Sequence, residues 1–150
     1  LNEIATDFSE VPRICCYRSR VGQSVTALLF NAAEVLQQKH KRALSNGVNF
    51  VGQIKVETSA VSRDEKPGVL VAVCDNGDGI AEEMREAVFD EFFTTKPAGM
   101  GAGLGLSIAR RLLSEHHGTL TVGDDETLGG ARFEIWLPLT GGPVGQTLPD

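Results

Sequence analysis

The sequence predicts an α/β (α+β) domain, a two-layer sandwich in which a mixed β-sheet carries helices on one face. Three observations lead to this prediction. Residues 69–74 are apolar without alternation, which is typical of a central strand buried on both faces. Several other segments alternate apolar and polar residues, as half-buried strands do. Two longer segments have apolar residues at helical spacing, so they can cover one face of the sheet.

Composition limits the class of protein. The 150 residues suffice for one domain with a substantial core. The formal net charge of −6 and the pI of about 5.1 argue against binding to nucleic acid. No apolar run approaches the roughly 20 residues of a membrane-spanning helix, and the chain begins at Leu1 without a signal peptide, so we expect a fragment of a longer protein. Three cysteines without zinc-ligand spacing favour a reducing, cytoplasmic compartment.

The first elements are expected to be strands followed by a long helix. Residues 1–8 predict a weak edge strand, and residues 11–16 predict a short strand with Pro12 near its start. Ser19 suits the N-cap of the helix. Apolar residues then recur at helical spacing and form one stripe: Val21, Val25, Leu28, Leu29, Ala32 and Leu36.

A second row of residues lies on one flank of this helix, at the edge of its buried face: Ala27, Asn31, Glu34 and Gln38. An asparagine there borders whatever cleft the helix lines, although an ordinary boundary asparagine explains the same pattern. The helix is expected to end in the basic run 39–42, which suits a helix C-terminus. We expect this run to be solvated and His40 to be exposed.

Two strands joined by a short turn come next. Residues 54–60 alternate in polarity and predict a half-buried strand. Residues 62–68 form a polar turn that contains Pro67, and the buried strand 69–75 follows. Such a short connection predicts an antiparallel pair.

The second half of the chain contains one clear helix. Residues 81–88 predict a short helix, residues 89–93 an aromatic cluster, and residues 94–103, with three glycines, a mobile loop. A helix over 104–117 follows, and Gly118 is a suitable stop. Its apolar face is Leu104, Ile108, Leu112 and Leu113.

Two strands over 119–122 and 131–139 close the domain. In the second of them, Phe133, Ile135 and Leu137 face one way, and Arg132, Glu134 and Trp136 face the other. We expect the domain to span residues 1–139 and residues 140–150 to be a flexible C-terminal tail.

A carboxylate stands at the end of the buried strand. Asp75 is followed by Gly77 and Gly79, which allow the backbone to come close to a ligand. A polar turn that closes a core strand is the alternative, and a D-x-G-x-G motif on its own favours that alternative. Other stretches of the chain change this balance.

Glycines also gather on the approach to the second helix, at Gly99, Gly101, Gly103 and Gly105. Backbone N–H groups can surround an anion there, and a helix N-terminus favours negative charge. We therefore expect a phosphate group as the ligand. The spacing is neither that of a Walker loop nor that of a Rossmann fingerprint. Residues 75–86 do not form a calcium loop, because Ile80 stands where glycine is needed.

These stretches together predict a nucleotide. Asp75 can accept a hydrogen bond from the exocyclic amine of adenine, whereas guanine offers a carbonyl at that place. A buried carboxylate left unpaired costs ~1–3 kcal/mol or more, which is enough for selection. Asn31 offers a neutral amide oxygen to a Mg²⁺ ion that takes its other ligands from phosphates and waters.

The motifs stand in the order of a known family. They are residues 23–34 (QSVTALLFNAAE), 75–80 (DNGDGI), 89–96 (FDEFFTTK) and 101–108 (GAGLGLSI), followed by His117-Gly118 and residues 130–133 (GARF). They resemble the asparagine, first glycine, phenylalanine, second glycine and closing motifs of the catalytic and ATP-binding domain of bacterial sensor histidine kinases. That domain belongs to the superfamily shared with gyrase and mismatch-repair ATPases. The resemblance covers roughly residues 11–139.

The resemblance implies a Bergerat-type fold that binds ATP or ADP with Mg²⁺. It implies transfer of the γ-phosphate to a histidine on a separate dimerisation and phosphoacceptor domain of the same protein, in a two-component system with a response regulator. The fragment itself is expected to be monomeric. The resemblance implies that Asn31 is the Mg²⁺ ligand and that Asn31 and Lys96 are the catalytic residues. It also implies that the segment before Gly101 is the ATP lid. The expected nucleotide contacts are Asn31, Glu34, Asp75, Gly77, Gly79, Ile80, Phe92, Thr94, Thr95, Lys96, Gly101, Gly103, Leu104, Gly105 and Leu106.

The chain departs from the family pattern at Ala27, Glu34 and Ala131. ATPases of the superfamily carry a glutamate at the first position to activate water, so Ala27 disfavours a hydrolysing ATPase. Some kinases place a basic phosphate contact at the second, and a hydroxyl residue often supports the adenine site at the third. A degenerate module of the same fold, which binds ATP without kinase activity, stays open as the alternative.

Overall fold

The computed structural model describes residues 2–93 and 105–139. Within these residues one sheet is formed, with the strand order β1-β2-β3-β5-β4. The β1–β2 pair is parallel and the other three pairs are antiparallel, so the sheet is mixed, as predicted. The strands are β1 (Asn2–Phe8), β2 (Gly52–Ala60), β3 (Gly68–Asp75), β4 (Thr119–Asp124) and β5 (Ala131–Pro138).

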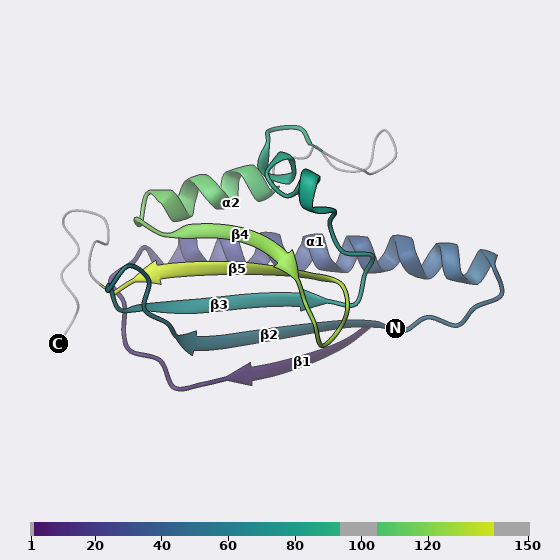
Figure 1. Ribbon diagram of the computed structural model, residues 1–150, viewed down its shortest axis with the longest axis horizontal. Coiled ribbons are helices and arrows are strands. Elements are labelled where there is room, and N and C mark those ends of the chain that lie inside the picture. The colour runs from purple at the N-terminus through teal and green to yellow at the C-terminus, as the bar shows by residue number, and fades with distance from the viewer. Residues whose placement is uncertain (1, 94–104, 140–150) are drawn as a thin grey trace.

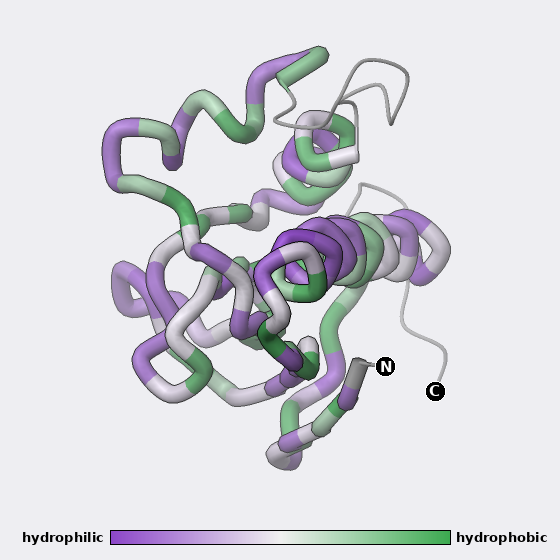
Figure 2. Tube along the Cα trace, turned by 90° about the vertical axis from the view of Figure 1, so that its right-hand side faces the viewer, coloured by the Kyte–Doolittle hydropathy of each residue, from purple (hydrophilic) through white to green (hydrophobic). Residues whose placement is uncertain are grey.

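Two helices, α1 (Arg18–Ser45) and α2 (Gly105–Ser114), pack side by side on one face of the sheet (Figure 1). Figure 2 shows both helices nearly end-on beside the strands. The core lies between the two layers, and its fully buried side chains include Leu28, Leu36, Leu113, Leu120, Phe133 and Ile135. This arrangement confirms the two-layer sandwich.

The central strand is β3, as its uninterrupted apolar run predicts. Val73 pairs with Val56 and Phe133 on the helix side, whereas Cys74 pairs with Lys55 and Arg132 on the opposite side. Cys74 is buried, and burial raises the pKa of its thiol to about 12. None of the three cysteines forms a disulfide bond.

Among the described residues, charged side chains and Trp136 cover the outer face of the sheet. Arg132 donates to Glu57 at 2.7 Å and to the sulfur of Cys74 at 3.2 Å. Trp136 lies beneath the Arg63 guanidinium, 5.8 Å from the ring centroid, and its Nε1 donates to the carbonyl of Val61 at 2.8 Å. These contacts bury Trp136 even though it alternates away from the core, as the pattern of β5 predicts.

The entry into α1 differs from the prediction. Residues 11–16 form no strand, and the N-cap is Tyr17, without a side-chain capping bond, rather than Ser19. The backbone N–H of Tyr17 donates instead to Nε2 of the buried His116, at 2.9 Å. The segment is therefore held by the far end of α2, which local sequence does not reveal.

The end of α1 also differs. The helix continues through the basic run to Ser45, because this run has partners in the fold. Lys39 and Arg42 contact the loop after β3, and Nδ1–H of the half-buried His40 donates to the carbonyl of Phe50 at 2.8 Å. The prediction of an exposed histidine is wrong, and the prediction of a solvated run holds for the exposed Lys41 and Arg42 but not for the half-buried Lys39.

Residues 81–88 form two 3₁₀ turns, η1 (Glu82–Met84) and η2 (Ala87–Phe89), instead of one short helix. The helix α2 ends at Ser114, three residues before the predicted end, and residues 115–117 form a turn that leads to Gly118. His117, with φ of 57°, takes the left-handed position, and Gly118 N–H donates to the carbonyl of Leu113 at 2.9 Å. Gly118 is needed for close packing, since a Cβ there would lie 2.6 Å from the carbonyl oxygen of Trp136.

In the described parts of the chain, no helix combines the length and the apolar character that crossing a membrane requires.

Candidate functional site

Asp75 ends β3 as a buried carboxylate, with 2% of its surface exposed. Its Oδ1 accepts hydrogen bonds from the backbone N–H groups of Gly77, at 2.8 Å, and Ala131, at 3.2 Å. Burial raises the pKa of Asp75, while these two donors and the nearby ammonium of Lys39 oppose the rise. Both of these hydrogen bonds are accepted by Oδ1, and neither uses Oδ2.

Three glycines shape the backbone around Asp75. A Cβ at Gly77 would lie 2.8 Å from Cγ1 of Val35 on α1, so only glycine allows this approach. A Cβ at Gly130 would collide with the backbone and carboxylate oxygens of Asp75 and lie 2.6 Å from Gly77 N. Gly79 has φ of 73°, which favours glycine. The hairpin between β4 and β5 is therefore pressed against the carboxylate.

The loop after Asp75 is fastened on two sides. Asn76 Oδ1 accepts the backbone N–H of Gln53 at 2.7 Å, and its Nδ2 donates to the carbonyl of Val51 at 3.0 Å. From α1, Lys39 Nζ donates to the carbonyls of Asn76, at 2.9 Å, and Gly77, at 3.2 Å. Sequence reasoning missed Lys39, although its place one helical turn after Val35 puts it on the same side of α1.

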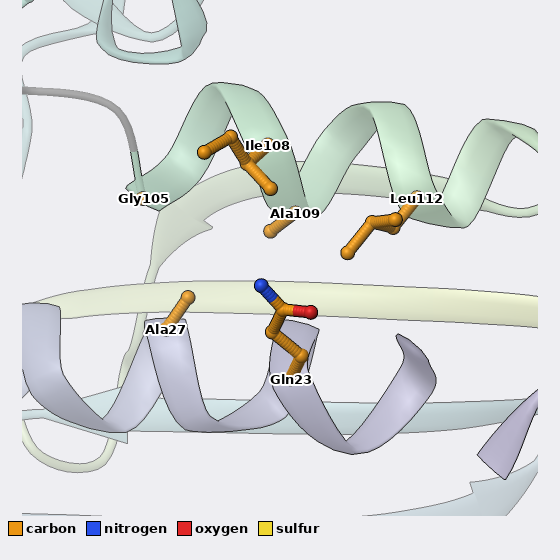
Figure 3. Close-up of a pocket in the computed structure, with 6 residues that line it drawn as sticks. All are labelled: Gln23, Ala27, Gly105, Ile108, Ala109 and Leu112. Carbon is orange, nitrogen blue, oxygen red and sulfur yellow. The ribbon is translucent and has the colours of Figure 1, made fainter. Parts of the chain in front are cut away.

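The flank of α1 faces the start of α2. Figure 3 shows Ala27 and Gln23 on α1 opposite Ala109, Ile108 and Leu112 on α2. These residues and Gly105 line a small cavity of about 70 Å³. A Cβ at Gly105 would come within 4.0 Å of Ala27 Cβ, so the first turn of α2 lies close to the turn of α1 that leads to Asn31.

The predicted site residues that the structure describes lie mainly on three elements: the end of β3, the flank of α1 and the start of α2. Asp75, Gly77, Gly79 and Ile80 lie together at the end of β3. Asn31 and Glu34 are half-buried on the flank of α1, and Gly105 and Leu106 begin α2. The side chains of Ile80 and Leu106 pack against the core. A ligand could therefore contact only their backbone or the exposed edge of their side chains.

Phe92 is 68% exposed and has φ of 63°, whereas its neighbour Phe93 packs against the core. The aromatic cluster is thus divided: Phe89 lies edge to face with Phe133 in the core, and Phe92 points away from it. The remaining predicted contacts lie outside the described residues. These are Thr94, Thr95, Lys96, Gly101, Gly103 and Leu104.

A glycine-lined aspartate at the end of a central strand, beside two helices on one face of a mixed sheet, defines a nucleotide-binding sandwich of the ATPase type. The family model described as "Histidine kinase-, DNA gyrase B-, and HSP90-like ATPase" matches residues 19–141, and the chain belongs to this family. The Bergerat-type fold implied by the motifs is confirmed.

The chain is similar to sensor histidine kinases and other sensor proteins. The sensor histidine kinase ZraS of Escherichia coli O157:H7 is 39% identical over 63% of this chain and 20% of its own length. The sensor protein ChvG of Rhizobium meliloti (strain 1021) is 31% identical over 92% of this chain and 23% of its own. The structure of full-length ShkA in complex with AMPPNP has a TM-score of 0.70 and 28% identity, covering 95% of this chain and 27% of that chain. The chain thus spans about a fifth to a quarter of these relatives and is an ATPase domain of the histidine kinase type.

Proposed function

We propose that this domain binds Mg-ATP and transfers the γ-phosphate to a histidine on a separate phosphoacceptor domain of the same protein. The observation that carries the proposal is the buried carboxylate of Asp75, held on Oδ1 by two backbone donors at the end of β3. The AMPPNP complex of ShkA, which shares this fold, supports an adenine nucleotide as the ligand.

Asp75 reads the adenine base. Its Oδ2 accepts a hydrogen bond from the exocyclic amine of adenine. In a guanine nucleotide a carbonyl oxygen takes the place of the amine, so that two acceptors would face each other without a proton between them. Leaving such a buried group unpaired costs ~1–3 kcal/mol, which corresponds to a preference of roughly 5- to 150-fold for ATP.

The flank of α1 and the start of α2 hold the phosphate end. Asn31 offers a hard amide oxygen, and among the described residues no cluster of three or more His, Cys, Asp or Glu side chains could hold a metal by itself. Such a donor set fits Mg²⁺, which keeps several waters and takes its other ligands from phosphates. When bound, Mg²⁺ neutralises charge on the phosphate oxygens. The N-terminus of α2 at Gly105 adds backbone N–H groups and a partial positive charge.

The remaining contacts complete the phosphate site in this proposal. Thr94, Thr95 and Lys96 approach the phosphates from the lid, together with the backbone of Gly101, Gly103 and Leu104. Lys96 shares the catalytic role with Asn31 by stabilising charge on the γ-phosphate.

The acceptor has to come from another domain. In the transfer, an imidazole nitrogen forms a bond to the γ-phosphorus while the bond from phosphorus to the β–γ bridging oxygen breaks, and ADP leaves with the electron pair. The imidazole proton goes to a base beside the acceptor histidine. Within this chain, His40 donates to Phe50 and His116 is buried with both ring nitrogens engaged. His117 lies beyond the far end of α2, a helix of ten residues that is about 15 Å long at 1.5 Å per residue.

The experiment combines titration with a transfer assay. Calorimetry should show ATP and ADP binding at micromolar to millimolar strength, with weaker binding of GTP. Labelled ATP should leave no phosphohistidine on the isolated domain and should label an added cognate acceptor domain, from which a response regulator then takes the phosphate. Acid-labile label on the isolated domain, or equal affinity for ATP and GTP, would overturn the proposal.

A non-catalytic ATP-binding module of the same fold is the second candidate. The observation that favours it is Ala27, an apolar side chain that lines a cavity facing α2 and offers no polar group to the proposed phosphate end. Tight ATP binding without transfer to a cognate acceptor would select this candidate. In either case we propose a monomeric, cytoplasmic domain.

A further inference from the structure

The ammonium of Lys39 contacts the backbone of the loop that follows Asp75. Its side chain is 30% exposed, and Nζ sits over the ring of Phe50, 4.8 Å from the centroid. From there it donates to the carbonyls of Asn76, at 2.9 Å, and Gly77, at 3.2 Å. The distance of 3.8 Å to Asp78 Oδ1 is longer than these hydrogen bonds, so the main contact of Lys39 is with the backbone.

One peptide unit joins Lys39 to Asp75. The C=O of Asn76 and the N–H of Gly77 belong to the same planar unit, and in a trans peptide they point in opposite directions. The oxygen of this unit accepts from Lys39, and its N–H donates to Asp75 Oδ1 at 2.8 Å. The peptide therefore lies between a cation and a carboxylate, an arrangement in which each hydrogen bond polarises the next.

We propose that Lys39 is a positioning residue for adenine recognition. Through the Asn76–Gly77 peptide it fixes the orientation of the Asp75 carboxylate and strengthens the hydrogen bond that holds Oδ1. Oδ2 is thereby turned toward the base. The proposal rests on the role of Asp75 proposed above and assigns to α1 a part in base selectivity beyond the metal and phosphate contacts of its flank.

Other contacts hold the loop after β3 in place without donating to the Asn76–Gly77 peptide as Lys39 does. Arg42 pairs with Asp78 through exposed side chains, and Asn76 is tied to the start of β2 through its own side chain. The loop should therefore stay folded when Lys39 is replaced. What is lost is the charge behind the peptide, which also helps to keep Asp75 ionised.

The test compares ATP with the triphosphate of purine riboside, which lacks the exocyclic amine. The affinity ratio of the two nucleotides isolates the hydrogen bond to the amine, since everything else in the ligands is shared. In Lys39→Met, which keeps an apolar stem over Phe50, we expect this ratio to fall about three- to tenfold, because charge-assisted hydrogen bonds are roughly twice as strong as neutral ones. Lys39→Arg should keep most of the ratio, and Lys41→Met, an exposed neighbour, should keep all of it.

Each outcome of these titrations either supports or contradicts the positioning role of Lys39. If Lys39→Met weakens both nucleotides equally and the ratio stays at the wild-type value, Lys39 is only structural and the proposal is wrong. Should Lys39→Met not fold, Lys39→Gln, which can still reach one carbonyl without a charge, carries the same comparison. If the wild-type protein itself shows no preference for ATP over the purine analogue, the role of Asp75 fails instead, and the two failures are thereby distinguished.

Discussion

Replacing Gly130 by alanine should damage both stability and nucleotide binding, because this glycine lies against the Asp75 carboxylate, which we propose reads the adenine base. The added Cβ would lie 2.6 Å from Gly77 N and closer still to the backbone and carboxylate oxygens of Asp75. Ordinary contacts need about 1 Å more, so the hairpin has to move away and the hydrogen bond from Ala131 N–H to Oδ1 is lost. Overpacking costs about 1–3 kcal/mol, and a lost hydrogen bond to a charged group costs about 1–3 kcal/mol, which gives a loss of about 2–6 kcal/mol.

Urea unfolding and calorimetry with ATP measure the two effects. The matched control is Gly123→Ala in β4, where nothing lies within 4 Å of the added Cβ, and we expect it to keep both stability and affinity. A double-mutant cycle with Asp75→Ala should show coupling, since removing the carboxylate removes part of the collision. A Gly130→Ala variant as stable as the wild type with unchanged ATP affinity would refute this reasoning, and additive effects in the cycle would show that the collision is with backbone alone.

Three further predictions concern the turn between β2 and β3, the protonation of Asp75, and the cavity between the two helices. Asp64 and Glu65 have φ of 50° and 64° in the turn between β2 and β3, so Asn-Gly at these positions should stabilise the domain by about 1–2 kcal/mol in urea unfolding without changing ATP affinity. Because burial raises the pKa of Asp75, the folded state binds its proton more tightly than the unfolded state. The stability of the wild type relative to Asp75→Asn should therefore be highest at acidic pH and fall as pH rises through the raised pKa, which a series of unfolding curves would show. Ala27→Leu should fill the cavity between the helices and raise the free energy of unfolding by about 1 kcal/mol, and a loss of stability would mean that the cavity cannot accept the side chain.

The parts of the fold that sequence predicts well are those specified by neighbouring residues. The apolar run of β3 identifies the central strand, and the D-x-G-x-G motif places Asp75 at its end, because both features depend on local patterning. The alternation in β5 likewise assigns Phe133 and Ile135 to the core. For the same reason the asparagine flank of α1 could be recognised from residue spacing alone.

What sequence did not predict depends on contacts between distant segments. Lys39 stands in a basic run that suits a helix terminus, and only the packing of α1 against the loop after β3 shows that its ammonium is taken up by backbone carbonyls. Tyr17 begins α1 without a capping side chain, because the partner of its N–H is His116, 99 residues further along the chain. Propensity rules describe local competition between conformations and carry no information about such pairs.

The two ends of the site are held by different means. At the proposed adenine end, the carboxylate of Asp75 is fixed by Gly77, Ala131 and the hairpin at Gly130, so the base selection that we propose rests on a closely packed end of the central strand. The phosphate end depends on α2, whose far end is tied to the start of α1 by the hydrogen bond between Tyr17 and His116 and by the ion pair of Arg20 with Glu115 at 2.9 Å. These ties hold the C-terminal end of α2, whereas the phosphate site that we propose lies at its N-terminus. In the function that we propose, the domain would hold ATP by its base at Asp75 and present the γ-phosphate at the N-terminus of α2, near Ala27, which has no group that could activate water for hydrolysis.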